Sequence, residues 1–161
     1  TYNDFNNKKF KKVEMSSLIK IYGKIFKSFF DNEFKASKPF KYSYSIQNAA
    51  AIGKDQYMNS HCHLPSSFSC VHYLKIDENN SGITFKNPNN ISETMQWIAP
   101  KTYDILNKLD TSNSYFFPTF NLKPKEDTML IFPSTLHHAV ERQIDSKNLR
   151  VSVATNITLD E

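Results

Sequence analysis

The sequence of 161 residues is poor in glycine, cysteine and tryptophan, with three, two and one of them. Two cysteines, Cys62 and Cys70, are too few for a disulfide scaffold, and C-x-x-C and zinc-finger spacings are absent, so we expect free thiols. No apolar run approaches the roughly 18 residues of a membrane span, and the N-terminus lacks the apolar centre of a signal peptide. These absences favour a soluble, cytoplasmic protein with no membrane partner.

Length and composition predict a single domain over residues 1–161. This length suits one hydrophobic core, and a content of 39% hydrophobic and 22% charged residues excludes the disordered and collagen-like classes. The chain begins with Thr1 and not with Met, which is expected if residues have been removed or left out before it.

The net charge of +4 arises from the N-terminal quarter of the chain. Residues 1–40 carry nine lysines and four acidic residues, a balance of +5, and the remainder sums to −1. A basic segment of this kind could contact nucleic acid, but no aromatic stacking motif accompanies it. We therefore favour a helix with a solvated lysine face.

The hydrophobic pattern predicts one helix followed by β structure. From about 13 to 31, apolar residues recur every three or four positions, as on one face of an amphipathic helix. A β core is expected from about 39 to 159, and its predicted strands are 40–46, 67–76, 82–87, 127–133 and 149–159. A second helix is predicted over 100–110. Short strands need two facing sheets to bury a core, so the fold predicted is a mainly β sandwich or jelly roll.

The grouping of the five histidines indicates a metal site. His61 and His63 are two positions apart on a chain expected to be extended, so both side chains point to the same face. His137 and His138 are neighbours that point in opposite directions, so only one of them can join the first pair. Three imidazoles suit Fe, Zn, Cu or Ni and leave coordination positions free for catalysis. His72, inside a predicted strand, is better explained as a packed or edge residue.

A possible anion-binding pair lies in the last predicted strand. Alternation puts Arg150, Ser152 and Ala154 on one face and apolar side chains on the other. If that face points inward, a guanidinium fork and a hydroxyl are suited to hold a carboxylate. If it points outward, Arg150 is simply solvated. The strand pattern leaves both readings open.

Four segments together resemble the small 2-oxoglutarate/Fe(II)-oxygenase-like proteins of bacteria and phages. In order, they are HCHLPSSFSCVHYL (61–74), GITFKNP (82–88), LIFPSTLHHAV (130–140) and LRVSVATN (149–156). The resemblance implies a double-stranded β-helix, the cupin-like jelly roll, with the N-terminal helix packed on it. It also implies Fe(II), 2-oxoglutarate as cosubstrate, and O₂. The compartment would be a cytoplasm, that of the host if a phage encodes the protein.

The resemblance assigns roles to individual residues. The residues that match the family's metal ligands, and hence its catalytic centre, are His61, His63 and His138. The residues that match its cosubstrate-binding positions are Arg150, Ser152 and Tyr73. The activity implied is a dioxygenase that hydroxylates an unidentified substrate and releases succinate and CO₂.

One departure from the family bears directly on the metal. The usual triad is two histidines and one carboxylate, and here His63 stands at the carboxylate position. Three imidazoles could bind the metal, a carboxylate such as Asp55 could approach from elsewhere, or metal binding could be weakened. Three neutral ligands would leave Fe(II) with its full charge, which favours an anionic cosubstrate.

Two other functions fit the sequence. One is a three-histidine, cupin-like metal protein that does not use 2-oxoglutarate; the other is a non-catalytic jelly roll, such as a phage structural or accessory protein, with its histidines on the surface. Arg150 distinguishes the oxygenase from the first alternative, and metal content distinguishes both from the second. The substrate and the oligomeric state are not determined by the sequence.

Overall fold

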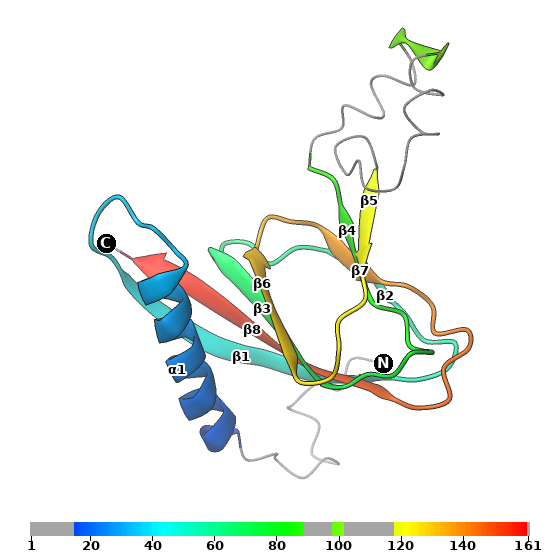
Figure 1. Cartoon of the computed structure of the whole chain (residues 1–161), viewed down its shortest axis with the longest axis horizontal. Helices are drawn as coiled ribbons and strands as arrows, with labels where there is room; N and C mark the ends of the chain where they lie inside the picture. The colour runs from blue at the N-terminus through cyan, green and yellow to red at the C-terminus, as the bar shows by residue number, and fades with distance from the viewer. Residues whose placement is uncertain (1–14, 89–97, 102–117, 161) are drawn as a thin grey trace.

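The computed structural model describes residues 15–88, 98–101 and 118–160, which contain helix α1 (Ser16–Asn32) and eight strands (Figure 1). The strands are β1 (Lys41–Ile52), β2 (Met58–His61), β3 (Phe68–Lys75), β4 (Ile83–Lys86), β5 (Thr119–Leu122), β6 (Thr128–Pro133), β7 (His138–Val140) and β8 (Arg150–Asp160). The helix predicted at 100–110 lies almost entirely outside the described residues. In the described part of the chain, no helix is long and apolar enough to cross a membrane.

The strands form two four-stranded antiparallel sheets. The major sheet has the order β1-β8-β3-β6, and the minor sheet has the order β2-β7-β4-β5. From β1 to β4, and again from β5 to β8, successive strands alternate between the sheets. This alternation is the topology of a double-stranded β-helix, so the predicted jelly roll with an N-terminal helix is confirmed.

The apolar face of α1 packs on the outer side of the major sheet (Figure 1). Tyr22, Phe26 and Phe30 are buried, and they share one core cluster with Val153 and Ile157 of β8. The ring of Phe26 is fully buried, and aromatic rings dominate the contact. Because α1 covers one face of β8, the apolar side chains of that strand pack on the face that the helix covers.

A polar bridge also ties α1 to the major sheet. The Nε2 atom of His72 lies 3.0 Å from a carboxylate oxygen of Asp127, and its Nδ1 lies 2.9 Å from the hydroxyl of Tyr22. A carboxylate only accepts, so in the neutral imidazole Nε2 donates to Asp127 and Nδ1 accepts from Tyr22. His72 is therefore a packed residue on the helix side, as the sequence indicates.

A β-bulge at Gln47 changes which residues of β1 face the helix. The register between β1 and β8 shifts between Ile46 and Asn48. Before the shift, Tyr44 packs against the helix cluster, whereas beyond it Asn48 and Ala50 line a pocket between the sheets. One extra residue reverses which side chains face each side of the sheet in the rest of the same strand. The bulge thus turns a polar side chain into the interior.

All five strands predicted from the sequence are present, and three further strands were not predicted. The three are β2, β5 and β7, with four, four and three residues. Segments of three or four residues rarely show a recognisable alternation of apolar and polar residues; β4, also of four residues, was predicted as part of the longer segment 82–87. Two of them, β2 and β7, carry the histidines considered next.

Replacement of Phe26 tests the contact between the helix and the sheet. Phe26→Ala should lower the free energy of unfolding by about 3–5 kcal/mol, because it removes a buried aromatic side chain and leaves a cavity. Urea unfolding followed by circular dichroism measures this. Phe120→Ala is the matched control, since that ring is 54% exposed. Equal losses in the two variants would contradict the packing described here.

The buried hydroxyl of Tyr22 on α1 predicts a loss of stability at alkaline pH. Burial raises the pKa of Tyr22 to about 12 from an ordinary value of 10.0, so the unfolded chain releases this proton at a lower pH than the folded one. Stability should therefore fall as the pH rises from 10 to 12. Tyr22→Phe should lose less over this range in urea titrations, whereas Tyr57→Phe, at an exposed ring, should follow the unsubstituted protein. If the free energy of unfolding of all three proteins fell equally with pH, the loss of stability would not come from Tyr22.

Candidate metal centre

The pairing of two short strands brings the histidines of distant segments together. His61 is the last residue of β2 and lies directly opposite His138, the first residue of β7. His63 follows two positions later, and its backbone N–H donates to the carbonyl of Ser134, 2.9 Å away. Ser134 is fully buried, and its hydroxyl bonds to that of Ser69 on β3 at 2.8 Å. These bonds hold the segment carrying His63 against the loop before β7.

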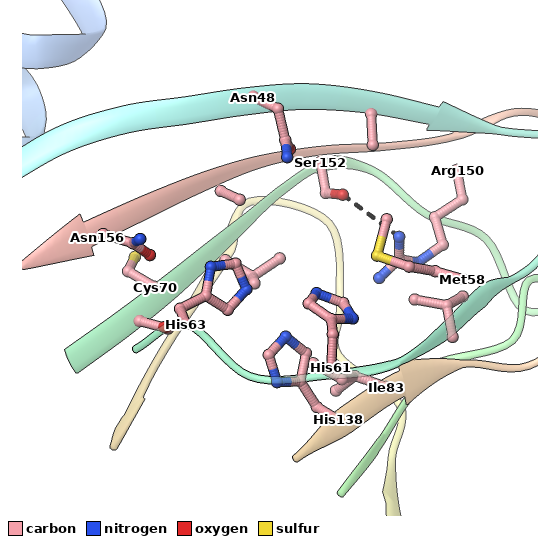
Figure 2. A pocket seen from close by; sticks show the side chains of 15 residues that line it. Asn48, Met58, His61, His63, Cys70, Ile83, His138, Arg150, Ser152 and Asn156 are labelled. Atoms are coloured by element: carbon pink, nitrogen blue, oxygen red, sulfur yellow. Dashed lines mark hydrogen bonds between the residues drawn. The ribbon is translucent and has the colours of Figure 1, made fainter. Parts of the chain in front are cut away.

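The three imidazoles His61, His63 and His138 form one cluster, shown in Figure 2. Each can offer a nitrogen atom such that the three atoms lie within 4.8 Å of one another. The ring centroids are 4.4 Å apart for His61 and His138, 5.0 Å for His61 and His63, and 5.3 Å for His63 and His138. Small side-chain rotations would bring three nitrogen atoms within bonding distance of one ion, about 2.1 Å.

Backbone carbonyls select the tautomer of two of these rings. The Nδ1 atom of His138 lies 3.0 Å from the carbonyl of Leu136, and the Nδ1 atom of His61 lies 2.8 Å from that of Asn59. A carbonyl oxygen can only accept, so Nδ1 carries the proton in both. The Nε2 lone pairs are then free, which is the arrangement that outer hydrogen bonds commonly impose on metal-binding histidines.

Burial favours the uncharged form of His63 and His138 near neutral pH. His138 is only 4% exposed, and burial lowers its pKa to about 4, with the bond to the Leu136 carbonyl opposing this shift. Burial also lowers the pKa of His63, and the nearby ring of His61 adds to the effect. Neutral imidazole is the form that binds metals. The chemistry of the three donors therefore fits a transition-metal ion.

The structure brings His63 to the cluster and keeps the other candidates away. The carboxylate of Asp55 lies 3.1 Å from the guanidinium of Arg142 in a half-exposed ion pair, and no acidic residue lines the pocket within the described part of the chain. His137 is exposed, while its neighbour His138 is buried. The hypothesis that Asp55 approaches the histidines is therefore wrong for this structure.

Arg150 lies inside the molecule, in the same pocket as the cluster (Figure 2). It is 2% exposed, so the reading in which it is simply solvated is wrong. Its Nη1 donates to the hydroxyl of Ser152 at 3.3 Å, and its Cζ lies 4.9 Å from the ring centroid of Tyr73. Tyr73 is itself fully buried beside the guanidinium. The alternation predicted for this strand is therefore correct, with Ser152 also facing the pocket.

The guanidinium of Arg150 has no anionic partner among the residues described. Its Nε and the hydroxyl of Tyr73 are both buried without a hydrogen-bond partner there. Burial lowers the pKa of Arg150, which Tyr73 partly offsets, and burial raises the pKa of Tyr73. An unpaired buried cation costs several kcal/mol unless an anion joins it. The pocket thus carries a site suited to a carboxylate.

Other polar residues line the same pocket and were not among the sequence candidates. They include Asn48 on β1, Ser69 on β3 and Asn156 on β8. The alternation that groups Arg150 with Ser152 also extends to Asn156, so that residue could have been recognised. Asn48 could not, because its orientation depends on the bulge at Gln47.

A comparison with protein-family models assigns the chain to a family. The model described as "Putative 2OG-Fe(II) oxygenase" matches residues 49–156, about two thirds of the chain. The chain belongs to this family. The matched segment of this oxygenase-family chain contains the three clustered histidines and Arg150.

Two solved structures of bacterial proteins share its fold. An oxidoreductase of the 2OG-Fe(II) oxygenase family from Burkholderia pseudomallei aligns at a TM-score of 0.57 and 14% identity, over 88% of this chain and 56% of that protein. A prolyl-4-hydroxylase from Pseudomonas putida aligns at a TM-score of 0.50 and 10% identity, over 95% of this chain and 68% of that protein. The chain thus spans little more than half of the Burkholderia protein. A comparison with curated proteins finds no match.

Removal of single imidazoles tests the metal centre. His138→Ala should weaken Fe(II) binding by roughly 100-fold or more, because a direct ligand contributes at least as much as the outer-shell partners whose loss costs 10–100-fold. Anaerobic competition with a chromophoric chelator measures the affinity. His137→Ala is the matched control, since this exposed neighbour should leave the affinity unchanged.

The same assay tests whether His63, which stands where the family triad has a carboxylate, binds the metal. His63→Ala should weaken Fe(II) binding comparably to His138→Ala if three imidazoles form the site. An unchanged affinity in this variant would show that His63 is not a ligand.

Proposed function

We propose that this chain is an Fe(II)- and 2-oxoglutarate-dependent dioxygenase that hydroxylates a substrate and releases succinate and CO₂. The observation that carries the proposal is the buried Arg150, without an acidic partner in the described part of the chain, in one pocket with three clustered imidazoles. A cation and a metal-ligand cluster in one pocket suit a cosubstrate that chelates a metal at one end and carries a carboxylate at the other.

In this proposal His61, His63 and His138 hold Fe(II). Imidazole suits iron, and three protein ligands leave further coordination positions for cosubstrate and O₂. Since none of the three ligands is charged, Fe(II) keeps its full positive charge. That charge favours the binding of an anionic chelator more strongly than a site containing a carboxylate would.

Arg150 and Ser152 hold the far carboxylate of 2-oxoglutarate. A guanidinium offers a planar fork of donors that matches a carboxylate. The hydroxyl of Ser152 accepts a bond from Arg150 at 3.3 Å, so its own proton is available to the same carboxylate. Tyr73 supports this pair, because its ring faces the guanidinium and limits the orientations of the side chain.

The chain's contribution to the reaction is positioning and the exclusion of water. When bound, Fe(II), 2-oxoglutarate and O₂ together would supply the oxidation: one oxygen atom of O₂ would enter the substrate C–H bond to give C–OH, and the other would enter succinate as CO₂ is released. Met58, Ile83 and Val140 line the same pocket with apolar side chains. A water-poor pocket strengthens the attraction between Arg150 and a carboxylate.

A second function has one observation in its favour. The presence of His63 where the family triad has a carboxylate suits a cupin-like metal protein that does not use 2-oxoglutarate. The buried cation of Arg150 favours the dioxygenase over this alternative, because only a carboxylate-bearing ligand needs it. A non-catalytic jelly roll with surface histidines is disfavoured by the burial of His138.

The test is an anaerobic titration of the metal-free protein with Fe(II) and then 2-oxoglutarate. Chelation of the keto acid produces a visible charge-transfer band. Arg150→Ala should keep Fe(II) but weaken 2-oxoglutarate binding by about 2–5 kcal/mol, the cost of losing one partner of a buried charge pair. Arg142→Ala is the control, since this arginine is exposed and paired with Asp55.

The outcomes of this titration separate the functions. Iron bound without a band would favour the three-histidine protein that does not use 2-oxoglutarate. No iron binding would favour the non-catalytic jelly roll. Normal 2-oxoglutarate affinity in Arg150→Ala would overturn the assignment of that residue.

A further inference from the structure

The pocket extends well beyond the length of one 2-oxoglutarate molecule. Arg150 and Asn156 both line it on β8; the guanidinium of Arg150 reaches Ser152, which leaves four residues, about 13 Å along a strand, between it and Asn156. The carbon chain of 2-oxoglutarate has only four C–C bonds of about 1.5 Å each. Figure 2 shows Arg150 at one end, Asn156 at the other and the imidazoles between them. The end around Asn156 is therefore left for another molecule.

The side chain of Asn156 offers an unused hydrogen-bond acceptor at this end. Its Oδ1 is buried and has no partner in the described part of the chain. Ser69 is its neighbour in the register on β3, and the Ser69 hydroxyl bonds to that of Ser134 at 2.8 Å. A buried acceptor without a donor costs free energy, which a ligand carrying an N–H or O–H group would recover.

A second carboxamide, that of Asn48, enters the pocket because of the bulge in β1. Beyond Gln47, Asn48 turns from the helix side to the pocket and lies opposite Ala154, between Ser152 and Asn156 along β8. Bulges next to functional sites commonly re-aim a side chain in this way. The small side chain of Ala154 leaves room above the sheet between the two carboxamides.

The charges at the two ends of the pocket differ. Arg150 is the one charged side chain among the described lining residues, and it lies at the far end from Asn156. No charged side chain lines the asparagine end, and bound 2-oxoglutarate already offsets two of the positive charges of the metal and Arg150, so a charged group brought there would lose its hydration and gain mainly neutral partners. An amide instead offers an N–H to Oδ1 and a carbonyl to Nδ2 of an asparagine.

We propose that Asn48 and Asn156 form the subsite for the molecule to be hydroxylated, and that this subsite selects an uncharged amide over carboxylates and ammonium groups. The proposal rests on the dioxygenase function proposed above. Arg150 and Ser152 then hold the anionic cosubstrate, whereas the asparagines hold a neutral substrate beside the same metal.

The test uses Mn(II)-loaded protein saturated with 2-oxoglutarate under argon, so that no turnover occurs. The paramagnetic ion increases the NMR relaxation rate of protons that bind near it. N-methylacetamide, acetate and methylammonium serve as neutral, anionic and cationic probes of similar size. We expect stronger relaxation enhancement for N-methylacetamide than for either ion, because saturating 2-oxoglutarate occupies Arg150 and two coordination positions of the metal.

Substitutions then assign the effect to the asparagines. Asn156→Ala should reduce the enhancement for N-methylacetamide about fivefold, the value expected for one neutral hydrogen bond. Asn48→Ala, on a different strand, should reduce it in the same direction and guards against misfolding of the first variant. Asn121→Ala is the matched control, because this exposed asparagine bonds to Thr84 on the minor sheet, outside the pocket.

Calorimetric titration of the Mn(II) protein with 2-oxoglutarate separates two kinds of failure. If 2-oxoglutarate does not bind, the proposed function is overturned and the subsite with it. If it binds, two results would overturn only the subsite. One is equal relaxation enhancement for the protons of the ions and of the amide; the other is an unchanged enhancement for N-methylacetamide in both asparagine variants.

Discussion

The antiparallel register between β2 and β7 is the constraint on which the metal centre depends. It sets His61 opposite His138, and a slip by one residue would turn one imidazole out of the pocket. The two strands are short, so their register is held by neighbours: β7 also pairs with β4, and the buried Ser134 joins the preceding loop to the major sheet. The relative positions of the three imidazoles thus depend on strand pairing throughout the jelly roll.

Helix α1 contributes to the site without touching it. By covering the outer face of the major sheet, it provides an apolar environment for Val153 and Ile157 of β8. The inner face of the same strand can then carry Arg150 and Ser152, which would be costly in a strand that had to supply the core on both sides. One strand serves stability on one face and ligand binding on the other.

The distribution of charge along the pocket gives a consistent account of the chemistry proposed. Three neutral imidazoles leave the charge of a bound metal uncompensated by the protein, and Arg150 adds a second positive charge farther along β8. Together these favour a dianionic cosubstrate lying between them. Asn156, at the other end, is uncharged, so a neutral substrate and an anionic cosubstrate would be sorted by electrostatics within one pocket.

The sequence alone was sufficient for features that depend on local pattern. The face of α1, the five predicted strands and the position of Arg150 on the face opposite its apolar neighbours all follow from periodicity, which is a property of consecutive residues. The same pattern left open whether the face with Arg150 points inward. Tertiary structure decided which residues meet. That His63, and not Asp55, joins the cluster depends on the path between β2 and β3, and that Asn48 faces the pocket depends on a bulge visible only against β8. Register and bulges are relations between distant strands, so no local pattern encodes them.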